Sequence, residues 1–277
     1  LKGLRILLVE DNEINQDFAS ELLNKTGIIV EIAGNGLIAL QMLEKHQFDC
    51  VLMDVQMPEM DGYAATRAIR LQEKFRQLPV IAMTAGAMSG DREKALQAGM
   101  NDYVTKPIDP QKLFRKLLQW AHLKTETAMT GKTSMTGSKE AVEMPRIPGM
   151  DTEASLERIG GNIAMLVKVL KKFCFNHADT TGKIQKALEA GQNDEARVLA
   201  HSLAGIAGNL GVKIIEDLAR AIELSIVGGQ IEDARKTLLK LETELHQFIA
   251  AAEQQLNEVA QPLVATHATI QQPQKGL

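Results

Sequence analysis

The chain lacks the features that mark several large classes of protein. Its only two cysteines, Cys50 and Cys174, are far apart in sequence, so we expect buried thiols in a reducing compartment, without a disulfide or metal role. No apolar run approaches the roughly 20 residues of a membrane helix, and no signal peptide opens the chain. The net charge is only −4, with both signs interspersed, so nucleic acid is not an expected partner. We therefore expect a cytoplasmic segment that contacts neither nucleic acid nor a membrane.

What the chain does have is length enough for two ordinary domains. With 277 residues, each half can bury a hydrophobic core of its own. The first residue is Leu1 instead of methionine, so we expect a piece of a longer protein, and that parent protein could be anchored in a membrane.

Residues 1–123 alternate short apolar runs with amphipathic stretches, which is typical of βαβ units and a parallel sheet. We expect strands near 5–10, 28–33, 49–54, 79–84 and 101–105. Helices are expected over 13–26, 36–46, 61–73, 89–98 and 110–123, with N-caps at Asn12, Asn35, Asp61 and Asp109. Right-handed crossovers leave few topologies, and we expect a doubly wound, flavodoxin-like α/β fold with a five-stranded parallel sheet in the order 2-1-3-4-5.

The composition changes after residue 123. Residues 124–150 are rich in Thr, Ser, Gly, Lys and Pro and have no aromatic side chain, so we expect a flexible linker, which would span roughly 30 Å. Residues 151–255 carry apolar side chains at helical spacing, which predicts an all-α helical bundle. Its helices are expected near 152–159, 162–178, 179–190, 193–210, 212–227 and 231–256. We expect residues 256–277 to form a disordered tail.

Polar side chains stand at the ends of four expected strands of the first domain. Glu10 and Asp11 follow the first strand, Asp54 ends the third, Thr84 ends the fourth and Lys106 follows the fifth. The carboxyl ends of parallel strands meet at one edge of the sheet, where open α/β folds bind their ligands. Taken singly, each acid could simply cap a helix, but the whole set in strand order favours a site.

The residue types of this set point to phosphoryl chemistry. Clustered carboxylates repel one another unless a cation lies among them, and hard oxygen ligands suit Mg²⁺. A carboxylate such as Asp54 can accept a phosphoryl group as an aspartyl phosphate. The ammonium of Lys106 and the hydroxyl of Thr84 are suited to contact the phosphoryl oxygens.

His201 is the one of the six histidines with unusual surroundings. It lies in the helical segment ARVLAHSLAGIAGNLGV, where Gly205 and Gly208 each cost roughly 1 kcal/mol relative to Ala. On a helix these glycines share a face with His201 and Ala204. We therefore expect the imidazole to stand on a bare surface that another domain can approach, where a neutral ring nitrogen can accept a phosphoryl group.

The motifs LLVEDN, LMDVQMPEMDG, MTA and DYVTKP occur in this order in residues 1–123, which resemble a response-regulator receiver domain. The resemblance implies that Asp54 accepts a phosphoryl group and that Thr84 and Lys106 contact it. It also implies a cis peptide bond at Lys106–Pro107.

The same resemblance implies a metal site and a conformational switch. Mg²⁺ would be held by Asp11, Asp54 and the backbone carbonyl of Gln56, with Glu10 acting partly through water. Tyr103 would be the aromatic switch that turns inward on activation, together with Thr84.

Residues 151–255 resemble a histidine phosphotransfer domain, on the strength of LERIGGNIAMLVKVLKKF and of AHSLAGIAGNLG. The resemblance implies that His201 is the phosphoryl acceptor. The family commonly has lysine three residues after the histidine, and this chain has Ala204. Substitute cations could come from a nearby helix or the same helix: Lys168, Lys171, Lys172 or Arg197.

Together these features predict the C-terminal part of a hybrid sensor histidine kinase. Phosphoryl groups would pass from an upstream histidine kinase domain to Asp54, then to His201, then to a downstream response regulator. The chain has no glycine-rich ATP site, so we do not expect it to charge itself from ATP.

Two alternatives remain open on the sequence alone. A Mg²⁺-dependent aspartyl phosphatase or phosphotransferase of similar fold would carry DxDxT after its first strand, where this chain reads EDN. A helical domain that acts only as a docking module, with an unreactive His201, is suggested by Ala204.

Overall fold

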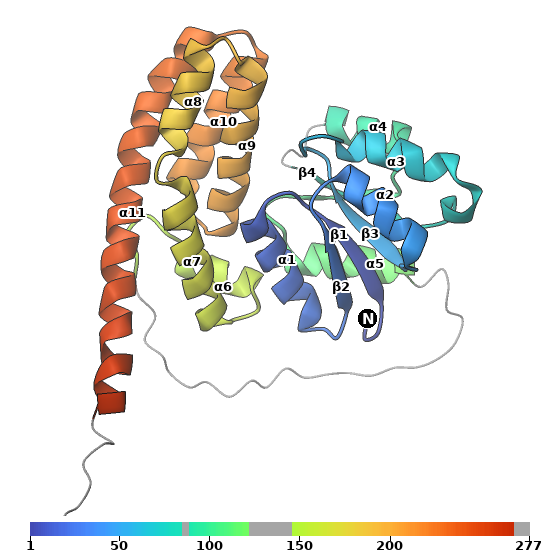
Figure 1. Ribbon diagram of the computed structural model, residues 1–277, viewed down its shortest axis with the longest axis horizontal. Helices are drawn as coiled ribbons and strands as arrows, with labels where there is room; N and C mark the ends of the chain where they lie inside the picture. The colour runs from blue at the N-terminus through green and yellow to red at the C-terminus, as the bar shows by residue number, and fades with distance from the viewer. Residues whose placement is uncertain (85–88, 122–145, 269–277) are drawn as a thin grey trace, which may run out of the picture.

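The computed structural model describes residues 1–84, 89–121 and 146–268 (Figure 1). The first part forms a five-stranded parallel sheet in the order β2-β1-β3-β4-β5, so the predicted order is confirmed. Its strands are β1 Arg5–Val9, β2 Ile29–Ala33, β3 Cys50–Asp54, β4 Val80–Thr84 and β5 Asp102–Thr105. Every position of β3 and β4 is buried, which explains why these strands read as continuous apolar runs.

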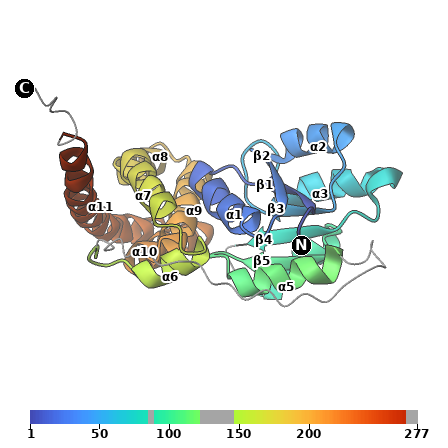
Figure 2. The same ribbon diagram turned by 90° about the horizontal axis from the view of Figure 1, so that it is seen from below.

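Helices cover both faces of the sheet (Figure 2). One face packs against α1 Glu13–Asn24 and α5 Pro110–Ala121. The other face packs against α2 Gly36–Lys45, α3 Gly62–Leu71 and α4 Ser89–Gln97, with the short 3₁₀ helix η1 Glu73–Phe75 after α3. The predicted N-caps are confirmed, because a side-chain oxygen of each accepts from a backbone N–H in the first turn: Asn12, Asn35, Asp61 and Asp109.

The second part is a helical bundle, as predicted. Its helices are α6 Thr152–Arg158, α7 Ile163–His177, α8 Thr180–Glu189, α9 Asn193–Asn209, α10 Lys213–Val227 and α11 Ile231–Ala268. Helix α11 continues well past residue 256, where we expected a tail to begin. Residues 122–145 and 269–277, which hold most of the expected linker and the end of that tail, lie outside the described residues. Within the described part of the chain, no helix is both long and apolar enough to span a bilayer.

The bundle begins before the expected boundary at residue 151. Ile147, which precedes α6, is buried among the core side chains of the bundle. The expected linker therefore ends a few residues too late, because a short apolar segment among polar residues gives no periodic signal of its own.

Helix α1 is the element through which the two parts meet (Figures 1 and 2). Its Ile14 and Phe18 are 0% and 3% exposed and belong to the hydrophobic core of the bundle, whereas Leu22 and Leu23 belong to the core of the sheet. Helix α1 thus has two apolar faces, one for each core. This placement brings the carboxyl edge of the sheet against α9.

Polar contacts frame this apolar junction. The Nζ of Lys172 on α7 lies 2.7 Å from a carboxylate oxygen of Asp17 on α1. At the far end of α1, Lys25 donates to the backbone oxygens of Ile159 and Gly160, at 3.0 and 2.6 Å. The apolar centre and its polar rim are the usual anatomy of a specific interface.

Candidate functional site

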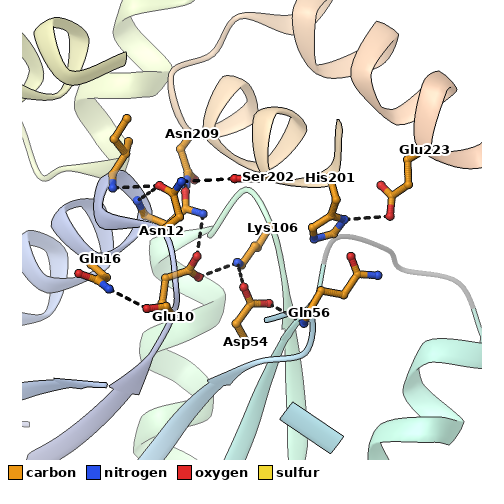
Figure 3. A network of polar contacts seen from close by, with 12 residues as sticks. Glu10, Asn12, Gln16, Asp54, Gln56, Lys106, His201, Ser202, Asn209 and Glu223 are labelled. Atoms are coloured by element: carbon orange, nitrogen blue, oxygen red, sulfur yellow. Dashed lines mark hydrogen bonds and ion pairs between the residues drawn. The ribbon is translucent and has the colours of Figure 1, made fainter. Parts of the chain in front are cut away.

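The three predicted carboxylates converge at the carboxyl edge of the sheet, and Figure 3 shows two of them, Glu10 and Asp54. Glu10 and Asp11 follow β1, and Asp54 ends the neighbouring β3. One ligand oxygen from each lies within 4.8 Å of the others. Glu10 and Asp54 are both 2% exposed, so their charges are costly unless a cation or hydrogen-bond donor compensates them.

Lys106 supplies part of that compensation. It follows β5, two strands away from Asp54 in the sheet, and its Nζ lies 2.6 Å from Oε2 of Glu10 and 2.6 Å from Oδ2 of Asp54. The peptide bond between Lys106 and Pro107 is cis, as expected. One buried ammonium thus faces two buried carboxylates, with a third nearby.

Three carboxylates share one ammonium in this pocket, and their burial together with these charges shifts the pKa values. Burial raises the pKa of Asp54 above its usual range even though Lys106 opposes the shift, and Glu10 adds to it. Burial and then Glu10 raise the pKa of Asp11 as well. Burial alone would lower the pKa of Lys106, but Asp54 and Glu10 outweigh it and raise that pKa. A second cation would relieve the remaining repulsion.

The backbone around Asp54 is held tightly. The amide nitrogen of Gln56 donates to Oδ1 of Asp54 at 3.2 Å. Gly62 begins α3 so close to β3 that a Cβ there would lie 2.1 Å from the backbone oxygen of Asp54, so only glycine fits at this position. The carboxylate oxygens of Glu10, Asp11 and Asp54 are hard donors, and this set fits Mg²⁺ in chemistry and spacing.

Thr84 and Tyr103 differ in their relation to this pocket. Thr84 ends β4, is 7% exposed and lines the same cavity as Asp54. Tyr103 on β5 is half-buried, and the Nζ of Lys116 lies 5.0 Å from the centre of its ring. It lines a separate cavity together with Trp120. Of the two residues expected in the switch, Thr84 therefore lines the acidic pocket and Tyr103 does not.

His201 lies across the acidic pocket on α9 (Figure 3). A single cavity of about 590 Å³ is lined by both His201 and Asp54. Oε1 of Glu223 on α10 lies 2.9 Å from Nδ1 of His201. Because a carboxylate accepts from an N–H, this contact favours the tautomer with the proton on Nδ1 and a free electron pair on Nε2.

The face around His201 differs in part from our expectation. A Cβ on Gly205 would lie 3.8 Å from Nδ2 of Asn15 on α1, so Gly205 does lie against the first domain. Ala204, however, is 0% exposed in the bundle core, and a Cβ on Gly208 would lie 3.2 Å from the Glu216 carboxylate within the bundle. These two small residues serve packing inside the bundle.

The cations that could replace a lysine at position 204 lie in three different settings. Lys168 and Lys172 pair with Asp17 on α1 and belong to the junction between the domains, and Lys171 is exposed. Arg197 lines the shared cavity.

Sequence reasoning missed Arg220 and Glu223 on α10. Arg220 lines the shared cavity, donates from Nη2 to the backbone oxygen of Lys106 at 3.3 Å and pairs with Glu216 at 2.9 Å. No sequence pattern marks these residues, because their roles arise from the packing of α10 beside α9. The one signal that could have pointed to Arg220 and Glu223 is their charge, because charged residues are unusual on the inner face of a bundle helix.

Two family models match the chain. The response regulator receiver domain matches residues 6–118, and the Hpt domain matches residues 168–263. The acidic pocket lies in the first match and His201 in the second. Both family resemblances inferred from the sequence are therefore confirmed.

Similar curated proteins are sensor kinases. The signal transduction histidine-protein kinase BarA of Escherichia coli (strain K12) is 32% identical over 245 residues, which cover 88% of this chain and 26% of BarA. The sensor protein GacS of Pseudomonas syringae pv. syringae is 31% identical over 251 residues, covering 87% of this chain and 27% of GacS. The chain thus spans about a quarter of the length of these relatives.

Among solved structures, the chain is similar to the receiver domain of the sensor histidine kinase PA1611 from Pseudomonas aeruginosa PAO1, described with a magnesium ion coordinated in its active-site cleft. The identity is 47%, the match covers 43% of this chain and 98% of that chain, and the TM-score is 0.41. It is also similar to the receiver domain of Ssk1 in its complex with the histidine phosphotransfer protein Ypd1 of Saccharomyces cerevisiae, at 32% identity, covering 44% of this chain and 90% of that chain, with a TM-score of 0.42.

Proposed function

We propose that this chain, which consists of a response regulator receiver domain followed by an Hpt domain, carries phosphoryl groups in a two-component phosphorelay. The single observation that supports this function best is the shared cavity that Asp54 and His201 both line. A phosphoryl group on either residue would lie between them. The division into a receiver domain over about 1–121, a connecting segment and a helical phosphotransfer domain from about 146 is part of this proposal.

In the first step, a carboxylate oxygen of Asp54 attacks the phosphorus of a phosphohistidine on an upstream kinase domain. The bond from phosphorus to the donor nitrogen breaks as the bond to Asp54 forms, and the donor histidine takes back its electron pair. Lys106 and Thr84 are placed to hold the phosphoryl oxygens.

In the second step, Nε2 of His201 attacks the same phosphorus. The bond to Asp54 breaks, the carboxylate leaves with the electron pair, and a phosphohistidine forms. Glu223 holds the Nδ1 proton of His201 and stabilises the positive charge that develops on the ring. Arg197 and Arg220 both line the cavity. They are the cations that would take the role of the missing lysine. His201 would then donate to a downstream response regulator.

Mg²⁺ is the metal that the pocket fits. Asp11, Asp54 and the backbone carbonyl of Gln56 would hold it, with Glu10 beside them. When bound, it screens the negative charge of the incoming phosphoryl group. The clustering of the three carboxylates supports this assignment, and so do the pKa values of Asp54 and Asp11, which burial raises first and the neighbouring Glu10 carboxylate raises further.

The docking-module alternative is less well supported. The family match to the Hpt domain and the position of His201 beside Asp54 favour a reactive histidine. An upstream kinase domain and a downstream response regulator are the partners that such a pair of domains requires. A cytoplasmic location follows from the same proposal, since phosphorelay partners meet there.

The function is tested by phosphorylating the full chain with labelled acetyl phosphate and Mg²⁺. We expect label on Asp54 and, after incubation, acid-labile and alkali-stable phosphate on His201. Asp54→Asn should abolish both labels. Equal labelling of the Asn variant and the wild-type chain would contradict the assignment of Asp54.

A further inference from the structure

A buried chain of three side chains connects the helical domain to the acidic pocket (Figure 3). Nδ2 of Asn209, at the end of α9, donates to Oδ1 of Asn15 on α1 at 2.9 Å. Nδ2 of Asn15 donates in turn to Oε1 of Glu10 at 2.9 Å. The three residues are at most 6% exposed, so one protected amide links a residue of the phosphotransfer domain to a carboxylate of the receiver domain.

The orientation of the Asn15 amide is set from both sides, by the carboxylate of Glu10 and by the side-chain nitrogen of Asn209. An asparagine side chain offers an acceptor on one side and donors on the other. Because Asn209 donates to the oxygen of Asn15, the nitrogen of Asn15 faces Glu10. The reverse orientation would place a carbonyl oxygen against a carboxylate, which is unfavourable in a dry environment.

Glu10 in turn contacts Lys106, which lies beside Asp54. Its other oxygen, Oε2, lies 2.6 Å from Nζ of Lys106, and the same ammonium lies 2.6 Å from Asp54. The position of the Glu10 carboxylate therefore helps to set where Lys106 stands relative to Asp54. Partners that orient the groups around a metal commonly affect its affinity.

We propose that Asn209 is a positioning residue that acts across the domain junction: when the phosphotransfer domain docks, it fixes Asn15 and, through it, the carboxylate of Glu10. The acidic pocket is then fully ordered only in the docked arrangement, so docking and Mg²⁺ binding strengthen each other. The purpose of this positioning rests on the proposed function, whereas the contacts from Asn209 through Asn15 to Glu10 do not depend on it.

The test compares the full wild-type chain with Asn209→Ala and with Glu21→Ala. Glu21 is the matched control, because it accepts a cross-domain hydrogen bond from Asn162 at 2.7 Å and has no part in the chain of contacts that reaches Glu10. Titration calorimetry with Mg²⁺ alone should give roughly threefold to tenfold weaker binding for Asn209→Ala, below the full effect of losing a direct partner of a metal ligand, and wild-type binding for Glu21→Ala. Without metal, NMR should show a shifted Asn15 side-chain amide signal only in the Asn209 variant.

A double-mutant comparison keeps the proposal falsifiable even if Asn209→Ala weakens the bundle. Asn15→Ala should weaken Mg²⁺ binding as well, and adding Asn209→Ala to it should cause no further loss. Fully additive losses, equal losses in the Glu21 control, or unchanged binding in Asn209→Ala would each overturn the positioning role. All three outcomes are measured by binding, so they are distinct from a failure of wild-type phosphotransfer, which would count against the proposed function instead.

Discussion

At the scale of single residues, Lys106 supplies the ammonium that compensates two buried carboxylates of the receiver domain. Its ammonium lies 2.6 Å from both Glu10 and Asp54, and all three side chains are buried. Removing one partner of a buried ion pair leaves uncompensated charge, which is far more costly than losing a pair at the surface.

Lys106→Met should therefore lower the free energy of unfolding by about 3 kcal/mol in the absence of Mg²⁺. Urea denaturation followed by circular dichroism measures this loss. Lys112→Met is the control: that side chain is 65% exposed, and its loss should change stability by less than about 0.5 kcal/mol. Equal effects of the two substitutions would mean that the pocket does not depend on Lys106.

His177 makes the stability of the bundle depend on pH. Burial lowers the pKa of His177 to about 4, with a smaller contribution from Lys183, and its Nδ1 lies 3.0 Å from the hydroxyl of Thr180. The unfolded chain therefore takes up a proton near pH 6.5 while the folded chain does not. The contribution of neutral His177 to the free energy of unfolding is fully present above that pH and is lost as the pH drops toward 4.

We expect His177→Gln to remove roughly 3 kcal/mol of the stability difference between pH 7 and pH 4. Denaturant unfolding at a series of pH values measures the slope. His246→Gln, at an exposed position on α11, should keep the wild-type slope. An unchanged slope in the His177 variant would show that another group is responsible.

The sequence allows some of these residues to be predicted and hides others for a physical reason. Glu10, Asp54 and Lys106 could be predicted because strand ends of a parallel sheet must meet at one edge. Glu223 and Asn209 could not, since their contacts depend on how α9 and α10 pack and dock, which no local pattern encodes.

At the scale of elements, α1 is the helix whose role was least visible in the sequence. A single amphipathic helix on a sheet needs one apolar face, but α1 has two, and Ile14 and Phe18 pack into the bundle. Without the second domain, Phe18 would be exposed. The extent of α11 was missed in a different way, because Pro262 lies within its final turns, and a proline inside a helical pattern usually marks the end of the helix.

Phe18→Ala should separate the domains while leaving the receiver folded. Loss of a large apolar contact at the junction should slow phosphoryl exchange between Asp54 and His201 by roughly tenfold or more, the factor that corresponds to 1.4 kcal/mol. Small-angle X-ray scattering should show a larger radius of gyration. Acetyl phosphate labelling of Asp54 should persist.

Phe75→Ala provides the control for that experiment. Phe75 packs against the opposite face of the sheet, so its removal should leave the dimensions of the chain and the exchange rate close to wild type. If Phe18→Ala has no more effect than Phe75→Ala, the junction at α1 does not support transfer.

At the scale of the whole molecule, we propose that the two domains form one transfer unit. Acidic residues of α1 face lysines of α7, with Asp17 between Lys168 and Lys172, and the apolar contacts of α1 lie beside them. This junction holds His201 and Asp54 on one cavity. Because the partners are joined in one chain, transfer should be first order in the chain, with a rate constant that does not depend on its concentration.

The most direct test of this account is a transfer experiment on the full chain at several protein concentrations. After labelling of Asp54 with acetyl phosphate and Mg²⁺ and removal of the donor, we predict that label appears on His201 as acid-labile, alkali-stable phosphate. The observed rate constant for this transfer should not change with protein concentration. His201→Gln should leave the label on Asp54. Absence of labelled His201 in the wild-type chain, or an observed rate constant that rises in proportion to protein concentration, would contradict transfer between these two residues within one molecule.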